Sequence, residues 1–282
     1  MNNKFSESDL YILHAVTNLH VGSGDNNFGI IDNQIQRDVT TGRPTINASS
    51  LKGGLREFFD PKEDETQFVK YVFGSHPKND RGNESQKGAY SFLSANLLVL
   101  PLRSNTKAFF RATSPAILQE LLDNLDTFAI DIPQKKDIAK LLEIEVKQNK
   151  PVIFEKLPGT IIEDYEADIQ EKNLSSLEEL LGKDIALVHE RDFDNYCENL
   201  PVIARNHLED GISQNLWYEE VVPRESRFYY IVTKPTNLDE SDRERIEKFE
   251  KQFDTEELIQ IGANATVGYG YTNIKKMQKV QS

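Results

Sequence analysis

The chain has 282 residues, with 33 Lys and Arg against 46 Asp and Glu, a formal net charge of −13, and one cysteine. This length suffices for one large domain with insertions, or for two small ones. The single Cys197 excludes an internal disulfide framework and a multi-cysteine zinc site. No run approaches the roughly 20 apolar residues that cross a bilayer, and the polar N-terminus does not resemble a secretory signal. We therefore expect a cytoplasmic protein with no membrane partner.

The acidic charge is concentrated in two segments, residues 163–184 and 238–258. Their alternating charged and apolar residues predict solvated helix faces. A general nucleic-acid coat commonly carries a broad basic surface. However, an acidic exterior can coexist with a local basic groove, so the net charge does not decide the question.

The first 113 residues predict strands, a long irregular stretch and a helix. Residues 8–17 are typical of a strand, and 21–47 contain four glycines without a sustained period. Structureless stretches of this length are uncommon in compact domains and are usually functional. A helix is expected over 49–59, a polar finger-like excursion over about 60–90, and strands at 91–104 and 107–113.

The remainder predicts a largely helical insertion followed by a β-rich end. Residues 115–200 are mainly helical and acidic, with an extended piece near 151–160, and 201–222 have the pattern of a β-hairpin. A strand at 226–232, an amphipathic helix at 238–252 and two closing strands at 257–262 and 272–276 follow. Strands at both ends with helices between them indicate one α+β domain interrupted by insertions.

The start of the predicted helix is the first candidate site. Ser49 and Ser50 are suited to capping, and Lys52 and Arg56, four residues apart, share one face. A helix N-terminus attracts phosphate through its free N–H groups and its dipole. Gly53 and Gly54 each cost about 1 kcal/mol relative to alanine, which close approach of another backbone would offset. A capped helix packed on a sheet explains the same residues, and both interpretations stay open.

A glycine loop near the C-terminus, IGANATVGYGY, carries Gly262, Gly268 and Gly270. It connects two predicted strands, so it is neither a P-loop nor a dinucleotide fingerprint, which run from a strand into a helix. It suits either a tight β connection or close approach of a ligand to the backbone.

Three carboxylates, Asp25, Asp32 and Asp38, lie in the irregular stretch after His20. Asp32 follows two isoleucines that could fix its direction, although Asp next to Asn33 is also typical of a turn. His20 suits a general base or a structural role.

The predicted hairpin carries Arg205, His207, Trp217 and Tyr218. Arginine and exposed aromatic residues suit stacking on single-stranded bases. Apolar packing within the hairpin is the alternative.

Taken in order, HVGSG, IIDNQIQRD, TGRP and SSLKGGLREFF resemble the N-terminal signature of the Cas-seven-like backbone subunits in the RAMP superfamily of CRISPR-associated proteins. The later blocks LLVLPLRS, LWYEEVVPRES and IGANATVGYGY resemble the branch formed by the fourth subunits of Cmr (type III-B) effector complexes. The matches run from about residue 10 to 275. Two positions depart from the pattern: Ala48 and Ala263 stand where glycine is usual.

The resemblance implies a modified ferredoxin-like (RRM-related) palm, with insertions over about 60–90 and 115–200 and a thumb hairpin over about 201–222. It further implies copies stacked along CRISPR guide RNA with other Cmr subunits, and cleavage of single-stranded target RNA at regular intervals. By position, Asp32 corresponds to the catalytic aspartate, and the resemblance implies that it positions a divalent metal, Mg²⁺, or orients the attacking 2′-OH. The residues expected to contact RNA are Ser49, Ser50, Lys52, Arg56, Arg205, Gly262, Gly268 and Gly270.

Three alternatives remain. The first is a scaffold of the same fold that binds guide RNA without cutting, and the second is a Csm-type (III-A) backbone subunit. The third is a guide-processing RAMP endoribonuclease that uses His20 as base.

Overall fold

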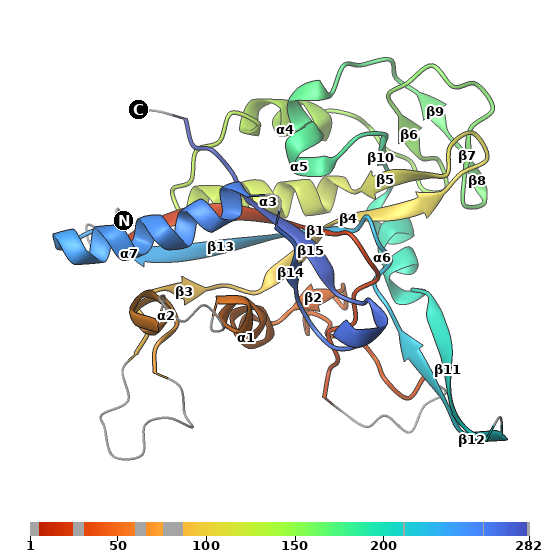
Figure 1. Cartoon of the computed structure of the whole chain (residues 1–282). Coiled ribbons are helices and arrows are strands. Elements are labelled where there is room, and N and C mark those ends of the chain that lie inside the picture. The colour runs from red at the N-terminus through yellow and green to blue at the C-terminus, as the bar shows by residue number, and fades with distance from the viewer. Residues whose placement is uncertain are drawn as a thin grey trace.

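The computed structural model describes residues 6–24, 31–59, 66–75, 87–210, 212–255 and 257–280 (Figure 1). Six elements form the core in the chain order β-α-β-β-α-β: β1 (Ser6–Ala15), α1 (Ala48–Phe59), β4 (Ala95–Arg103), β13 (Arg227–Pro235), α7 (Glu240–Lys251) and β15 (Tyr271–Lys276). The four strands lie in the order β15-β1-β13-β4, and each neighbouring pair is antiparallel. This is the ferredoxin-like arrangement, so the predicted α+β fold is confirmed.

Both core helices pack on one face of the sheet. Helix α1 buries Leu51, Leu55 and Phe59, a spacing of four that places the three side chains on one stripe. The ring of Phe59 lies 5.3 Å from that of Phe249 on α7, centroid to centroid. Residues 8–13 of β1 are all buried rather than alternately exposed, because this central strand is covered on both faces.

The opposite face is covered by α3 (Pro115–Thr127). Tyr230 of β13 stacks on Tyr11 of β1, with ring centroids 5.1 Å apart, and Tyr11 in turn contacts Phe253 just beyond α7. The neighbouring Tyr229 points the other way, as alternation along a strand requires, and its hydroxyl accepts a hydrogen bond from Asn124 of α3 at 2.9 Å.

Residues 115–200 are less helical than predicted. Besides α3 they contain α4 (Lys135–Leu142), α5 (Glu178–Leu181) with the short 3₁₀ turn η2 (Ser175–Leu177), and α6 (Glu190–Glu198). Three short strands extend the main sheet beyond β5 (Phe109–Thr113): β10 (Ile185–Leu187), β6 (Val152–Ile153) and β9 (Asp168–Ile169). A separate ribbon joins β7 (Ile161–Ile162) to β8 (Tyr165–Glu166). β6 lies in the extended piece expected over 151–160, whereas the other short strands escaped prediction because two or three residues show no period.

Three further strands complete the sheet. β2 (Thr45–Ile46) pairs with β4, β3 (Ser91–Phe92) with β13, and β14 (Ile259–Gln260) with β15. Part of the predicted excursion over 60–90 is a packed helix, α2 (Thr66–Phe73), which buries Phe68, Val69, Val72 and Phe73. Residues 60–65 and 76–86 lie outside the described part of the chain.

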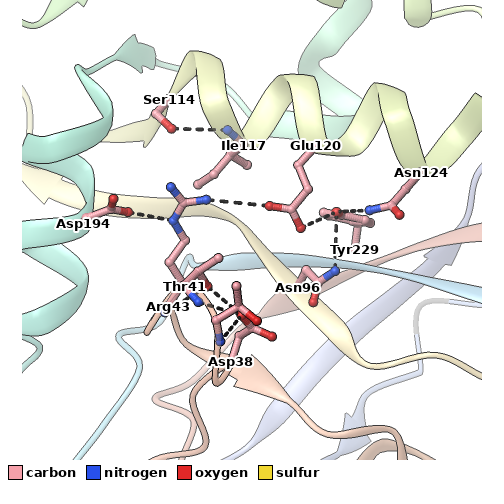
Figure 2. Close-up of polar contacts among 11 residues, drawn as sticks. Asp38, Thr41, Arg43, Asn96, Ser114, Ile117, Glu120, Asn124, Asp194 and Tyr229 are labelled. Atoms are coloured by element: carbon pink, nitrogen blue, oxygen red, sulfur yellow. Dashed lines mark hydrogen bonds and ion pairs between the residues drawn. The ribbon is translucent and has the colours of Figure 1, made fainter.

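The turn over residues 38–43 is anchored to α3 and α6 through Arg43 (Figure 2). The Arg43 guanidinium lies 2.7 Å from a carboxylate oxygen of Asp194 and 3.7 Å from one of Glu120. Inside the turn, an Asp38 oxygen accepts hydrogen bonds from the backbone N–H groups of Thr40 and Thr41. These bonds lower the pKa of Asp38, although its partial burial opposes them. Asp38 is thus a turn-forming residue.

The predicted hairpin is confirmed as β11 (Val202–Glu209) and β12 (Ile212–Glu220), which projects from the body of the molecule (Figure 1). Ile212 and Leu216 are 65% and 53% exposed. Among the hairpin residues whose burial the structure describes, only Glu219 and Glu220 at its base are buried. Within the described ranges no helix is long and apolar enough to cross a membrane.

Candidate nucleic-acid interface

The segment that carries Asp32 lies along the base of the hairpin. The backbone N–H groups of Asp32 and Asn33 both donate to the carbonyl of Tyr218 at 3.1 Å. In return, the N–H of Tyr218 donates to Asp32 Oδ2 at 2.8 Å. The Asp32 side chain is exposed, so its carboxylate is held in place by the hairpin yet open to solvent. The sequence had suggested a flexible loop here, and long-range pairing makes it an ordered one.

The buried side chain of Glu220 fixes the segment that carries Asp32. One carboxylate oxygen accepts the backbone N–H of Ile35 at 3.1 Å, and the other pairs with the guanidinium of Arg37. Glu220 is 3% exposed, and a buried carboxylate needs such partners to offset its lost hydration. The segment from 32 to 37 is therefore fixed relative to β12 at several points.

Glu219 connects the hairpin to the glycine loop. Its carboxylate accepts the side-chain amide of Asn264 at 2.9 and 3.0 Å and pairs with Arg205 at 3.1 Å. The Arg205 guanidinium also lies over the rings of Trp217 and Tyr269, 5.9 and 5.6 Å from their centroids. Arg205 thus has a role within the protein, and its predicted contact with RNA stays a prediction.

Sequence inspection missed Glu219 and Glu220 as organising residues of this site. The available signal was a pair of adjacent acids in the strand pattern LWYEEVV, where one of two neighbours must face inward. Both turn out to be buried, because β12 ends against the segment around Asp32 on one side and the glycine loop on the other.

His20 is buried beneath these two glutamates. Its Nδ1 lies 2.7 Å from the backbone carbonyl of Glu220, so Nδ1 carries the hydrogen and donates it. Its Nε2 is 3.9 Å from a Glu219 oxygen, and the residue is 4% exposed. A general base must reach the proton that it removes, and this environment favours a structural His20.

Helix α1 begins at Ala48, so Ser49 and Ser50 lie in its first turn rather than before it. The N–H groups of a first turn have no acceptor within the helix. Lys52 and Arg56 follow one turn apart. Partial burial, together with the charges of Arg56 and Lys87, lowers the pKa of Lys52. Three basic side chains therefore repel one another at this end of the molecule, an environment that favours an anion.

The glycine loop packs directly on α1, and it supplies the close approach that Gly54 left open in the sequence. A β-carbon on Gly54 would lie 2.7 Å from Ile261 Cδ1 and 3.4 Å from the carbonyl of Gln260. This close approach explains Gly54. A β-carbon on Gly53 would meet nothing within 4 Å in the described part of the chain, so packing does not account for it.

The loop itself spans residues 261–270 between β14 and β15 and contains the short 3₁₀ turn η4 (Ala265–Val267). Gly262, Gly268 and Gly270 all have positive φ angles, at 92°, 83° and 77°. β-Carbons on Gly262 and Gly270 would lie 2.5 Å from the His20 carbonyl oxygen and 2.1 Å from that of Ile261. Internal packing alone requires these two glycines, whereas a β-carbon on Gly268 would meet none of the described atoms within 4 Å.

The structure thus gathers the predicted residues into one region. Glu219 links Arg205 to the glycine loop, the glycine loop packs on α1, and Gln36 reaches Ser50 at 2.9 Å. Asp25 lies outside the described residues, and Asp38 belongs to the turn anchored by Arg43.

The described side chains do not by themselves form a metal site. No group of three or more His, Cys, Asp or Glu residues with suitable spacing occurs among them. Mg²⁺ keeps several waters and is commonly held by one or two carboxylates plus substrate phosphates. A divalent ion at Asp32 would therefore need RNA phosphate oxygens and water to complete its shell.

Comparison with known proteins places the chain in a family. The sequence profile of the RAMP superfamily matches residues 12–273. The chain therefore belongs to the RAMP superfamily, whose members include the CRISPR proteins that it resembles.

The individual relatives narrow the placement to the Cmr4 branch. The chain is 30% identical over 282 residues to the CRISPR system Cmr endoribonuclease Cmr4 of Pyrococcus furiosus, with 93% of each chain covered. It is 28% identical over 183 residues to the CMR subunit Cmr4 of Saccharolobus solfataricus, which covers 61% of this chain and 57% of that relative.

Two solved structures share the fold at 22% identity. A chain of the type III-B Cmr-beta complex bound to cognate target RNA matches with a TM-score of 0.78, covering 97% of this chain and 98% of its own. Oligomeric Cmr4 from Pyrococcus furiosus matches with a TM-score of 0.71, covering 99% and 100%.

Proposed function

We propose that the chain is a guide-RNA-binding backbone subunit of a type III-B CRISPR effector complex, and that Asp32 cleaves the bound target RNA. The observation that carries the proposal is the placement of Asp32, an exposed carboxylate fixed by Tyr218 at the base of a projecting hairpin. The relative in Pyrococcus furiosus, whose alignment covers 93% of this chain, is named a Cmr endoribonuclease. A subunit of this kind works in the cytoplasm, stacked with copies of itself and with other Cmr subunits.

In the proposed arrangement, the start of α1 holds the guide backbone. Ser49 and Ser50 offer first-turn N–H groups and hydroxyls, while Lys52 and Arg56 add charge. Gly53 and Gly268, which packing does not explain, let RNA approach the backbone closely. The hairpin is the thumb that interrupts the guide–target duplex.

In the proposed reaction, the 2′-oxygen of a target ribose loses its hydrogen and bonds to the adjacent phosphorus, which gives a 2′,3′-cyclic phosphate. The bond from phosphorus to the 5′-oxygen breaks, and the 5′-oxygen takes a proton from water. Asp32 Oδ2 already accepts the Tyr218 N–H, which fixes the carboxylate, so Oδ1 is the atom that orients or accepts the 2′-OH hydrogen. A divalent ion, if bound, supplies charge stabilisation at the phosphate. Asp32 and RNA oxygens together would hold such an ion.

The test separates binding from chemistry. Asp32→Ala should assemble with guide RNA and bind target RNA normally, yet cut at least about 10²-fold more slowly, because a positioned acid–base group supplies about 10²–10⁴-fold. Asp32→Asn retains an acceptor for Tyr218 and removes only the charge, so it should be equally slow. Asp131→Ala removes an exposed carboxylate from the helical region and should cut at the wild-type rate.

If Asp32→Ala cuts target RNA at the wild-type rate, Asp32 is not the catalytic residue. The result would then favour the alternative of a scaffold that binds guide RNA without cutting. Chelator followed by Mg²⁺ tests the ion separately: loss and recovery of cleavage supports a metal at the site. The guide-processing alternative is disfavoured by the buried His20, and both curated Cmr4 relatives favour the Cmr branch over a Csm-type subunit.

A further inference from the structure

Gln36 is a buried side chain whose amide joins separate segments of the proposed RNA site. It is 8% exposed. Its Nε2 donates to Ser50 Oγ at 2.9 Å and to the carbonyl of Gly22 at 3.2 Å. Its Oε1 accepts the backbone N–H of Asn47, immediately before α1, at 2.8 Å. Both ends of the amide are therefore used.

The backbone of Gln36 adds two further ties. Its N–H donates to the carbonyl of Val21 at 2.8 Å, and its carbonyl accepts from Thr45 at 3.0 Å. One residue thus joins the stretch after His20, the strand β2 that leads into α1, and the first turn of α1.

Gln36 also belongs to the segment that carries Asp32. Four residues of extended chain span about 13 Å, and this span is pinned by Glu220 at Ile35 and by Tyr218 at Asp32. Loss of the Gln36 contacts would therefore leave this segment, with Asp32 at its other end, held at fewer points. Misplacing a reacting group by about 1 Å can cost about 10²-fold in rate.

We propose that Gln36 is a positioning residue that couples the start of α1, where guide RNA is held, to the placement of Asp32. This inference rests on the proposed function. Because Gln36 donates to Ser50 Oγ, the Ser50 hydroxyl keeps its own hydrogen for a phosphate oxygen. The amide thereby ties the position of the first turn of α1 to the alignment of the cleaving carboxylate.

The experiment compares Gln36→Met with Gln134→Met in complexes assembled on guide RNA. Methionine has nearly the same length as glutamine but neither donates nor accepts comparably. Gln134 is also 8% exposed and lies next to α4, away from α1, so it matches the burial of the substituted side chain. Cleavage is measured at saturating target, separately from the affinities for guide and target.

Gln36→Met should cut at least about tenfold more slowly at saturating target, with both affinities within about threefold of wild type. Gln134→Met should be within about twofold in all three. Ser50→Ala removes the acceptor of the amide and should also slow cleavage. The double variant Gln36→Met/Ser50→Ala should be no slower than Gln36→Met alone, because the two changes break the same link.

Equal cleavage rates for Gln36→Met and Gln134→Met would overturn the inference, as would a loss confined to guide affinity. If Gln36→Met does not fold, Gln36→Asn, which keeps the amide but is one methylene too short, is judged by the same criteria. Failure of the proposed function has a different signature: Asp32→Ala then cuts as fast as wild type, whatever Gln36→Met does.

Discussion

Neutralising the basic face of α1 tests whether this helix holds RNA or only packs. In Lys52→Ala/Arg56→Ala, two predicted phosphate contacts disappear. For single strands each lost contact flattens the slope of log K against log salt by about 0.7, so the double variant should show a slope lower by about 1.4. Between about 50 and 200 mM salt its affinity for guide RNA should fall about sevenfold less than that of wild type.

The lowered pKa of Lys52 predicts that the affinity for guide RNA depends on pH. Burial, Arg56 and Lys87 lower this pKa in the free protein, while a bound phosphate would raise it again. Binding above the lowered pKa therefore requires uptake of a proton, and wild-type affinity should decline with rising pH in the alkaline range. The double variant should lack this component.

The assay is equilibrium binding of guide RNA over a salt series, with thermal unfolding of each variant measured alongside. The matched control is Lys136→Ala, an exposed lysine on α4. Arg56 also donates to the carbonyl of Ser75 at 3.3 Å, so some loss of stability is expected from its removal. If the double variant keeps the wild-type salt slope, α1 is a packing helix and its phosphate role is refuted.

Three further predictions follow from other contacts. Asp9 is buried, which opposes its ionisation, but Lys234, Lys276 and Lys279 outweigh burial and lower its pKa from 3.8 to about 2. The resulting stability, about 2 kcal/mol, should be complete above about pH 4 and lost as the pH falls toward 2; unfolding curves of Asp9→Asn should lack this step. Replacing residues 206–215 by a short turn should leave the melting temperature nearly unchanged, because the hairpin tip is exposed, but abolish regular spacing of cleavage products on a gel. Gly270→Ala should destabilise the fold, since its β-carbon would lie 2.1 Å from a carbonyl oxygen, whereas Gly268→Ala should cost only the strain of its positive φ, and a larger penalty than Gly270→Ala would contradict the packing argument.

Much of the fold could be predicted from local pattern. The strand at β1, the helices α1 and α7, the hairpin and the two closing strands all have either apolar periodicity or clear turn residues, and all are present. The failures have two causes. The strands β9 and β10 are too short to show a period, and α2 lies in a segment whose polar surroundings dominate the composition.

The candidate site divides in the same way. The paired serines, the basic residues of α1, the glycine loop and Asp32 could be singled out by residue type and by family resemblance. Their spatial relation could not, because it depends on contacts between residues far apart in the chain. Glu220 reaches back to Ile35 across 185 positions, and Asn264 reaches Glu219 from the last loop.

The sequence alone determined the longer elements of the core, since helix and strand periodicity depend on neighbours within a few residues. It also determined the family, because several ordered motifs survive along the whole chain. Only the tertiary structure decided that Asp32 is fixed rather than mobile, that Gly54 and Gly262 serve packing, and that Gln36 ties the helix start to the cleavage segment. Hydrogen bonds and close contacts of this kind depend on distances between folded segments, which no local pattern encodes.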